Sequence, residues 1–165
     1  MDTDEFALAV TTHGRRLAQL AFLLCGERAG AEDLVAEAYA RTWPRWSKGA
    51  VEELEPYLRR VIVNLALQRR RRLARDLRRR TSVRDVESHQ APDDSAVEHT
   101  DMTRALMRVP APQRAVVVLR YFEDLTEEET ARVLGVPVGT VKSRLSRAVA
   151  AMRSELEGGS DARGH

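Results

Sequence analysis

The sequence predicts an all-α protein of two small helical domains, the second containing a helix-turn-helix. Apolar residues recur every three or four positions in both halves of the chain, which is the spacing of a helix face. No segment alternates apolar and polar residues over the length of a β-strand. A polar stretch separates the halves, and 165 residues suffice for two small domains.

The first domain is expected over residues 1–80. Two apolar stripes predict its helices, one formed by Val35, Ala38, Tyr39, Thr42, Trp43 and Trp46 and the other by Leu58, Val61, Ile62 and Leu65. Trp43, Trp46 and Tyr57 have rings able to stack on unpaired bases. Because both tryptophans continue an apolar face, core packing is the favoured interpretation for them.

Arginine dominates the end of this domain. Residues 59–80 contain ten arginines and a single acid, Asp76. The spacing of Leu73 and Leu77 favours a continued helix over a disordered basic tail. Such a charge block predicts a surface that binds a polyanion through phosphate contacts.

Residues 81–101 are expected to form a flexible linker. They contain six acids against Arg84, and no Leu, Ile or aromatic residue. Such a composition buries too little apolar surface to offset the entropy lost on ordering. The second domain is therefore expected over residues 102–157, and residues 158–165 are expected to be a disordered tail.

Two helices of the second domain are predicted from their ends. Thr126 and Glu129 have the spacing of a capping box, which begins a helix. Gly135 is suited to a left-handed C-cap, and Pro137 opens the next helix. The apolar positions of that second helix continue as Val141, Leu145, Ala148, Val149, Met152 and Leu156.

The interval between these helices is typical of a helix-turn-helix. Ala131 is the small residue where helices cross, Gly135 lies in the turn and Val141 anchors the second helix. In this motif the second helix enters the major groove of DNA. The predicted DNA contacts lie off its apolar stripe: Thr140, Lys142, Ser143, Arg144 and Arg147.

Composition argues against several other classes of protein. The lone Cys25 excludes an internal disulfide, and the four histidines are too scattered for a catalytic or metal site. No apolar run reaches the roughly 20 residues of a membrane-spanning helix, and the N-terminus lacks a signal-peptide pattern. We therefore expect a cytoplasmic protein that is not an enzyme, with no cofactor, bound metal or membrane insertion.

Three segments together resemble an extracytoplasmic-function sigma factor of bacterial RNA polymerase. They are residues 31–46 (AEDLVAEAYARTWPRW), 57–72 (YLRRVIVNLALQRRRR) and 105–153, and they follow the order of that family. The resemblance implies a second sigma domain, a linker and a fourth sigma domain. It also implies binding to core RNA polymerase and recognition of the −10 and −35 promoter elements.

The resemblance implies two contacts with polymerase. One is made to the clamp helices of the largest subunit, by Asp33, Leu34 and Glu37. The other is made to the flap of the second-largest subunit, by an apolar surface over residues 105–122. An anti-sigma factor is a further candidate partner.

Promoter contacts follow from the same resemblance. The helix over residues 138–152 corresponds to the −35 reader, and residues 47–56 correspond to a loop that accepts a flipped base of the −10 element. Asn64 interrupts an apolar run, so by itself it fits either an exposed helix position or an amide that reads a base. The resemblance places Asn64 in the helix that lines the −10 pocket, with four arginines near the DNA: Arg59, Arg60, Arg69 and Arg70.

The main alternative function is a stand-alone helix-turn-helix regulator, such as a two-domain response regulator. Its receiver domain would need alternating strands and an acidic phosphorylation pocket, and residues 1–80 show neither.

Overall fold

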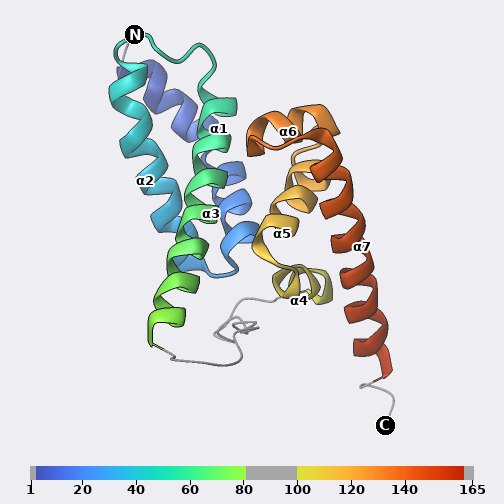
Figure 1. The fold of residues 1–165 in the computed structure, drawn as a ribbon. Helices are drawn as coiled ribbons and strands as arrows, with labels where there is room; N and C mark the ends of the chain where they lie inside the picture. The colour runs from blue at the N-terminus through green and yellow to red at the C-terminus, as the bar shows by residue number, and fades with distance from the viewer. Residues whose placement is uncertain (1–2, 81–99, 162–165) are drawn as a thin grey trace. The chain divides into compact units, whose positions relative to one another are not determined.

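The computed structural model describes residues 3–80 and 100–161, and all regular structure in these ranges is helical (Figure 1). The all-α prediction is therefore confirmed. None of the described helices is long and apolar enough to cross a membrane. The elements are α1 (Thr3–Cys25), α2 (Arg28–Trp46), α3 (Leu54–Arg80), α4 (Asp101–Arg108), α5 (Ala111–Val117), a π-helix η1 (Val118–Phe122), α6 (Glu127–Leu134) and α7 (Val138–Asp161).

The chain divides into two compact units, residues 1–66 and 67–165, and the division falls inside α3. The sequence predicted a domain boundary at residue 80, which is the end of α3 and not the position at which the two units divide. The expected linker, residues 81–101, lies mostly outside the described residues, although Asp101 already belongs to α4.

The C-terminal end of the second unit differs from the sequence-based expectation. We expected the folded part to stop at residue 157, but α7 continues through Asp161. Gly158 and Gly159 lower helix propensity without forcing a helix to end, because glycine retains access to helical backbone angles. Residues 162–165 lie outside the described part of the chain.

The first unit packs α1 against α2 around an aliphatic core. Fully buried side chains come from all three of its helices: Leu17 and Leu20 of α1, Leu34 of α2, and Leu58, Ile62 and Val63 of α3. Gly26, with φ of 82°, turns the chain between α1 and α2. A positive φ of this size suits glycine, which has no Cβ to clash.

An aromatic cluster joins α1 to α2. The ring of Phe6 meets Trp43 and Tyr39 edge to face, with centroids 5.2 and 6.2 Å away, and also contacts Trp46 at 6.5 Å. The expected packing role of both tryptophans is therefore confirmed. Burial raises the pKa of the Tyr39 phenol, since the ionised form would lose hydration.

The second unit is held together by α7, which packs against α4, α5 and α6. Arg114 lies on α5 and is only 3% exposed. Its guanidinium donates hydrogen bonds to the carbonyls of Leu106, Met107 and Val109 at 3.1, 2.9 and 2.9 Å. These carbonyls belong to the end of α4, where a helix runs out of internal donors, and of the three only the Leu106 carbonyl also accepts a backbone N–H in the described structure, that of Val109 at 3.2 Å. Arg114 therefore caps α4.

A single π-helical turn, η1, follows α5 directly. Two residues after its end at Phe122 lies Asp124, whose φ of 52° is the only positive value at a non-glycine residue in the described chain. The Arg120 side chain donates to the Leu125 carbonyl across this corner. The chain thereby reverses into the first helix of the helix-turn-helix.

Candidate nucleic-acid interface

The predicted helix ends of the helix-turn-helix are confirmed in the structure. The Thr126 hydroxyl accepts from the Glu129 N–H at 3.1 Å, and the Glu129 carboxylate accepts from the Thr126 N–H at 2.7 Å. This reciprocal capping box begins α6. Gly135 then ends the helix at φ of 65°, in the left-handed region.

A small apolar cluster fixes the crossing of α6 and α7. Val116, Ala131 and Val141 are buried together, and the partly buried residues packed against them are Leu134, Val136, Val138 and Leu145. The predicted roles of Ala131 and Val141 are therefore confirmed. Since this cluster occupies one face of α7, the opposite face of its first turns is left for a ligand.

All five predicted DNA contacts of the second domain lie on α7. Lys142, Ser143 and Arg147 are exposed, whereas Thr140 and Arg144 are half-buried. The Ser143 hydroxyl donates to the Thr140 carbonyl at 3.1 Å, which still leaves its oxygen as an acceptor. The set therefore combines hydroxyls and cations, the groups that base edges and phosphates bind.

One of these cations already has a partner within the chain. The Lys142 ammonium lies 3.7 Å from the carboxylate of Glu127, in the first turn of α6. Sequence reasoning missed this pair, because it forms across the turn at no regular helical spacing.

Asn64 lies midway along α3 and is half-buried. Its sequence neighbours Ile62, Val63 and Leu65 are buried in the core. On the helix surface its neighbours are Arg60 and Gln68, one turn before and after, and both are exposed. Asn64 therefore belongs to a polar stripe, a pattern that i, i+4 spacing would have revealed from the sequence.

The four arginines predicted near the −10 element differ in their surroundings. Arg59 is 14% exposed and binds both carboxylate oxygens of Glu55, at 2.7 and 2.9 Å. Its charge is thus compensated within α3. Arg60 is exposed, and Arg69 and Arg70 are half-buried.

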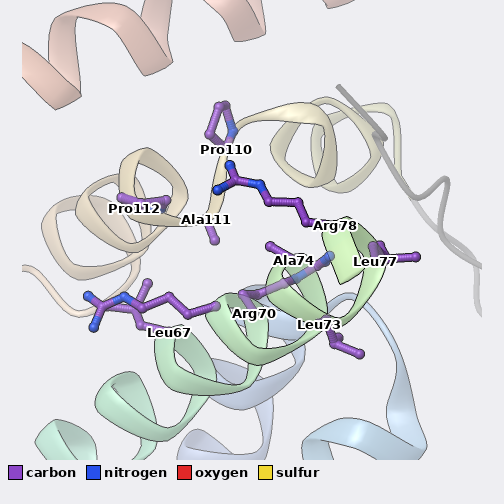
Figure 2. Close-up of a pocket in the computed structure, with 10 residues that line it drawn as sticks. Leu67, Arg70, Leu73, Ala74, Leu77, Arg78, Pro110, Ala111 and Pro112 are labelled. Atoms are coloured by element: carbon purple, nitrogen blue, oxygen red, sulfur yellow. The ribbon is translucent and has the colours of Figure 1, made fainter. Parts of the chain in front are cut away.

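The helix continues through the arginine-rich segment, as the Leu73 and Leu77 spacing predicted. Figure 2 shows Leu67, Ala74 and Leu77 interleaved with Arg70 and Arg78 along this half of α3. Apolar and cationic side chains therefore lie beside one another along this continuous helix.

The connection between α2 and α3 is anchored at both ends. Val51 is 3% exposed, and the chain turns at Gly49 with φ of 69°. The Arg45 guanidinium donates to the Tyr57 hydroxyl at 3.3 Å. This segment corresponds to the loop expected to accept a flipped base.

The polymerase-contact candidates lie on two sides of α2. Asp33 is exposed, and Glu37 is half-buried with its carboxylate 2.5 Å from Arg41. Leu34, in contrast, is fully buried. Its side chain supports the position of α2 and is not part of the surface.

The expected apolar surface over residues 105–122 is largely internal. Most of its apolar side chains form the core of the second unit, from Ala105 and Leu106 to Val118 and Leu119. Tyr121, on η1, is the large hydrophobic residue of this segment that is well exposed, at 63%. The expectation of an apolar surface failed because four short helices need these side chains to pack together.

Acidic, histidine and cysteine side chains do not gather into a metal site anywhere in residues 3–80 and 100–161. Cys25 is half-buried, and its thiol donates to the Glu27 carbonyl at 3.2 Å. Of the four histidines, only His13 is among the described residues.

Two family descriptions match the chain, one on each side of the expected linker. Residues 9–76 match "Sigma-70 region 2", and residues 99–152 match "Sigma-70, region 4". Their order is the one that the sequence resemblance implied.

Individual relatives cover nearly the whole chain. It is 40% identical to an RNA polymerase sigma-E factor of Streptomyces avermitilis, over 93% of this chain and 86% of that protein. It is 31% identical to an ECF RNA polymerase sigma factor, SigL, of Mycobacterium tuberculosis, over 88% of this chain and 85% of that one. Among solved structures, the sigma factor RpoE of Bartonella quintana, crystallised with the anti-sigma factor NepR, has a similar fold. That match has a TM-score of 0.72 at 24% identity and covers 94% of this chain and 98% of that chain.

Proposed function

Because this chain belongs to the extracytoplasmic-function sigma factors of bacterial RNA polymerase, we propose that it directs core polymerase to a specialised set of promoters through −10 and −35 contacts. The observation that carries this proposal is the match of both sigma regions, in order, to the two halves of one chain. The match of residues 9–76 to sigma-70 region 2 disfavours a stand-alone helix-turn-helix regulator. Sigma factors supply recognition and leave catalysis to the polymerase, so the protein is not an enzyme and acts in the cytoplasm.

The −35 element is read by the start of α7. Its cations, Lys142, Arg144 and Arg147, attract the phosphates and fix the register of the helix on the duplex. Arginine also reads guanine bidentately, and each such pair contributes about 1–3 kcal/mol of discrimination. Thr140 and Ser143 complete the set with hydroxyl groups.

Asn64 and the arginines of α3 act at the −10 element. Extruding a base from the duplex costs a few kcal/mol, and a pocket that holds the base offsets that cost. An amide on the polar stripe of α3 can hydrogen-bond a base edge, while Arg60, Arg69 and Arg70 hold the backbone. Arg59 is bound to Glu55, so we assign it to positioning of the helix.

The acidic edge of α2 contacts the largest polymerase subunit. Asp33 and Glu37 lie one turn apart on that edge, and buried Leu34 holds the helix beneath them. Since most apolar side chains of residues 105–122 form the core, we assign the flap contact to the exposed part of that segment around Tyr121. Two weak DNA-binding units gain from effective concentration when polymerase holds both.

An anti-sigma factor is the proposed regulator. The support is a protein of similar fold that was crystallised with such a partner. A partner covering either DNA-reading surface would keep the sigma factor inactive.

Run-off transcription with purified core polymerase on a genomic fragment library tests the function. We expect specific transcripts that require this chain. A stand-alone regulator would instead bind specific duplexes without polymerase and yield no such transcripts.

Charge reversal of the acidic edge tests the polymerase contact. Asp33→Arg combined with Glu37→Arg is expected to weaken binding to core polymerase at least about tenfold, because two attractive charges become repulsive. Binding is measured by fluorescence anisotropy of the labelled chain, with Glu32→Arg as an exposed control on α2. Unchanged affinity in the double variant would show that α2 does not form the contact.

A further inference from the structure

We infer that Glu127 is a positioning residue that holds Lys142 away from DNA phosphate and so limits the sequence-independent part of promoter binding. This inference rests on the proposed function of α7 as the −35 reader. It assigns a role to a residue outside the predicted DNA contacts.

The pair joins the two helices of the motif. The Lys142 ammonium lies 3.7 Å from the Glu127 carboxylate, and the side chains are 63% and 29% exposed. Glu127 is the first residue of α6, directly after the capping-box threonine. Because the capping box fixes this turn, the backbone of Glu127 has a defined position, and the long Lys142 side chain reaches its carboxylate from α7.

The start of α6 carries three consecutive acids, Glu127, Glu128 and Glu129. In a helix-turn-helix the first helix crosses the DNA backbone, and a helix start without acids would attract phosphate through its N–H groups and dipole. The three carboxylates cancel that attraction. One of them, Glu127, also competes with phosphate for the ammonium of Lys142.

The competition affects every DNA sequence alike. A lysine that must leave a carboxylate to reach a phosphate contributes less net attraction than one that is unpaired. Arg144 and Arg147 have no such partner among the ion pairs described above. A smaller share of the binding free energy for DNA therefore comes from phosphate contacts, and a larger share comes from the contacts that the rest of α7 makes.

A double-mutant cycle in the holoenzyme tests this inference. Glu127→Gln, Lys142→Gln and the double variant are each assembled with core polymerase. Two duplex probes are used, a promoter found by run-off transcription with the wild-type chain and the same duplex with a scrambled −35 element. Equilibrium binding is measured over a range of potassium chloride concentrations.

Glu127→Gln is expected to tighten binding to both probes by a similar factor of about two to five, as the release of an exposed ion pair allows. The slope of log affinity against log salt should steepen by about 0.9, the value for one added phosphate contact. Lys142→Gln should itself weaken binding to both probes, since it removes one of the cations of α7, and in its background Glu127→Gln should bring no gain.

Glu128→Gln is the matched control, since it removes the same charge one residue away from an exposed position. Because it weakens the acidic start of α6 without releasing Lys142, it should steepen the salt slope by clearly less than Glu127→Gln and be additive with Lys142→Gln. Helical circular dichroism on heating verifies that each variant keeps its fold.

An unchanged salt slope in Glu127→Gln, or additive effects of Glu127→Gln and Lys142→Gln, would overturn the inference. Failure of the wild-type holoenzyme to distinguish the two probes would instead overturn the −35 role of α7. The two failures are therefore separable.

Discussion

Replacing Arg114 by methionine is expected to destabilise the second unit by about 3–5 kcal/mol. Methionine keeps much of the buried aliphatic volume but removes the guanidinium. The Met107 and Val109 carbonyls at the end of α4 then lose the donor that the structure shows for them, and the Leu106 carbonyl keeps only the Val109 N–H. Each buried acceptor left without a partner costs about 1–3 kcal/mol, and entry of water at the helix end lowers the total.

This loss is comparable with the whole stability of the unit. Folded domains have about 0.05–0.15 kcal/mol per residue, which gives about 3–9 kcal/mol for the roughly sixty residues from α4 to α7. Arg114→Met should therefore leave α4 detached, or the second unit unfolded, under conditions in which the first unit remains folded.

The positions of the tryptophans make the assay specific. The chain has two, Trp43 and Trp46, and both lie in the first unit. In urea titrations, tryptophan fluorescence should follow the first unit alone, and far-ultraviolet circular dichroism should follow both. Arg114→Met should move part of the dichroism transition to lower urea and leave the fluorescence transition in place.

Arg132→Met provides the control, because Arg132 is an exposed arginine of α6. We expect it to change stability by no more than about 0.5 kcal/mol. A dichroism transition in Arg114→Met within about 1 kcal/mol of the wild type would refute the assigned role, since the loss of three buried hydrogen bonds should cost more than that even with some entry of water.

Three further predictions concern other sites. Arg144→Ala or Arg147→Ala should weaken the −35 footprint of the holoenzyme, by about 1–3 kcal/mol if the arginine reads a guanine. Affinity for core polymerase should stay unchanged, and a loss of that affinity would contradict this separation of roles. Asn64→Ala should retain closed-complex binding but reduce permanganate reactivity of unpaired thymines, because unstacking is no longer compensated, and a pre-melted template should restore transcription. Absence of that rescue, with normal core binding, would place Asn64 outside strand separation. Tyr39→Phe should be neutral or stabilising by up to about 1 kcal/mol in urea unfolding, because its hydroxyl is buried without a hydrogen-bond partner in the described structure; a clear loss of stability would mean that the hydroxyl does have one.

The sequence predicted a structural feature well wherever residues close together in the chain determine that feature. The capping box at Thr126, the left-handed Gly135 and the apolar stripe of α7 depend on neighbours within a few residues, and the structure confirms them. The continued helix through Leu73 is of the same kind.

Long-range packing accounts for what sequence reasoning missed. A family motif gives the position of Leu34 but not the side of α2 on which the core lies. The cap that Arg114 forms on α4 joins segments eight residues apart through a turn, and the Glu127 carboxylate reaches Lys142 through the geometry of another turn. Charge patterning identified a basic helix, yet which arginines are compensated, such as Arg59, depends on side-chain positions.

The unbroken course of α3 limits how this chain can change in length. The helix runs for 27 residues, or roughly 40 Å, from the core of the first unit through the arginine-rich segment (Figure 1). One residue inserted between Ala66 and Leu67 would rotate every later side chain by about 100° about the axis. The arginines would then face a different direction from Asn64, although no residue had been lost. Insertions over evolutionary time are therefore expected to collect in connections such as residues 47–53, and α3 is expected to diverge by substitution alone.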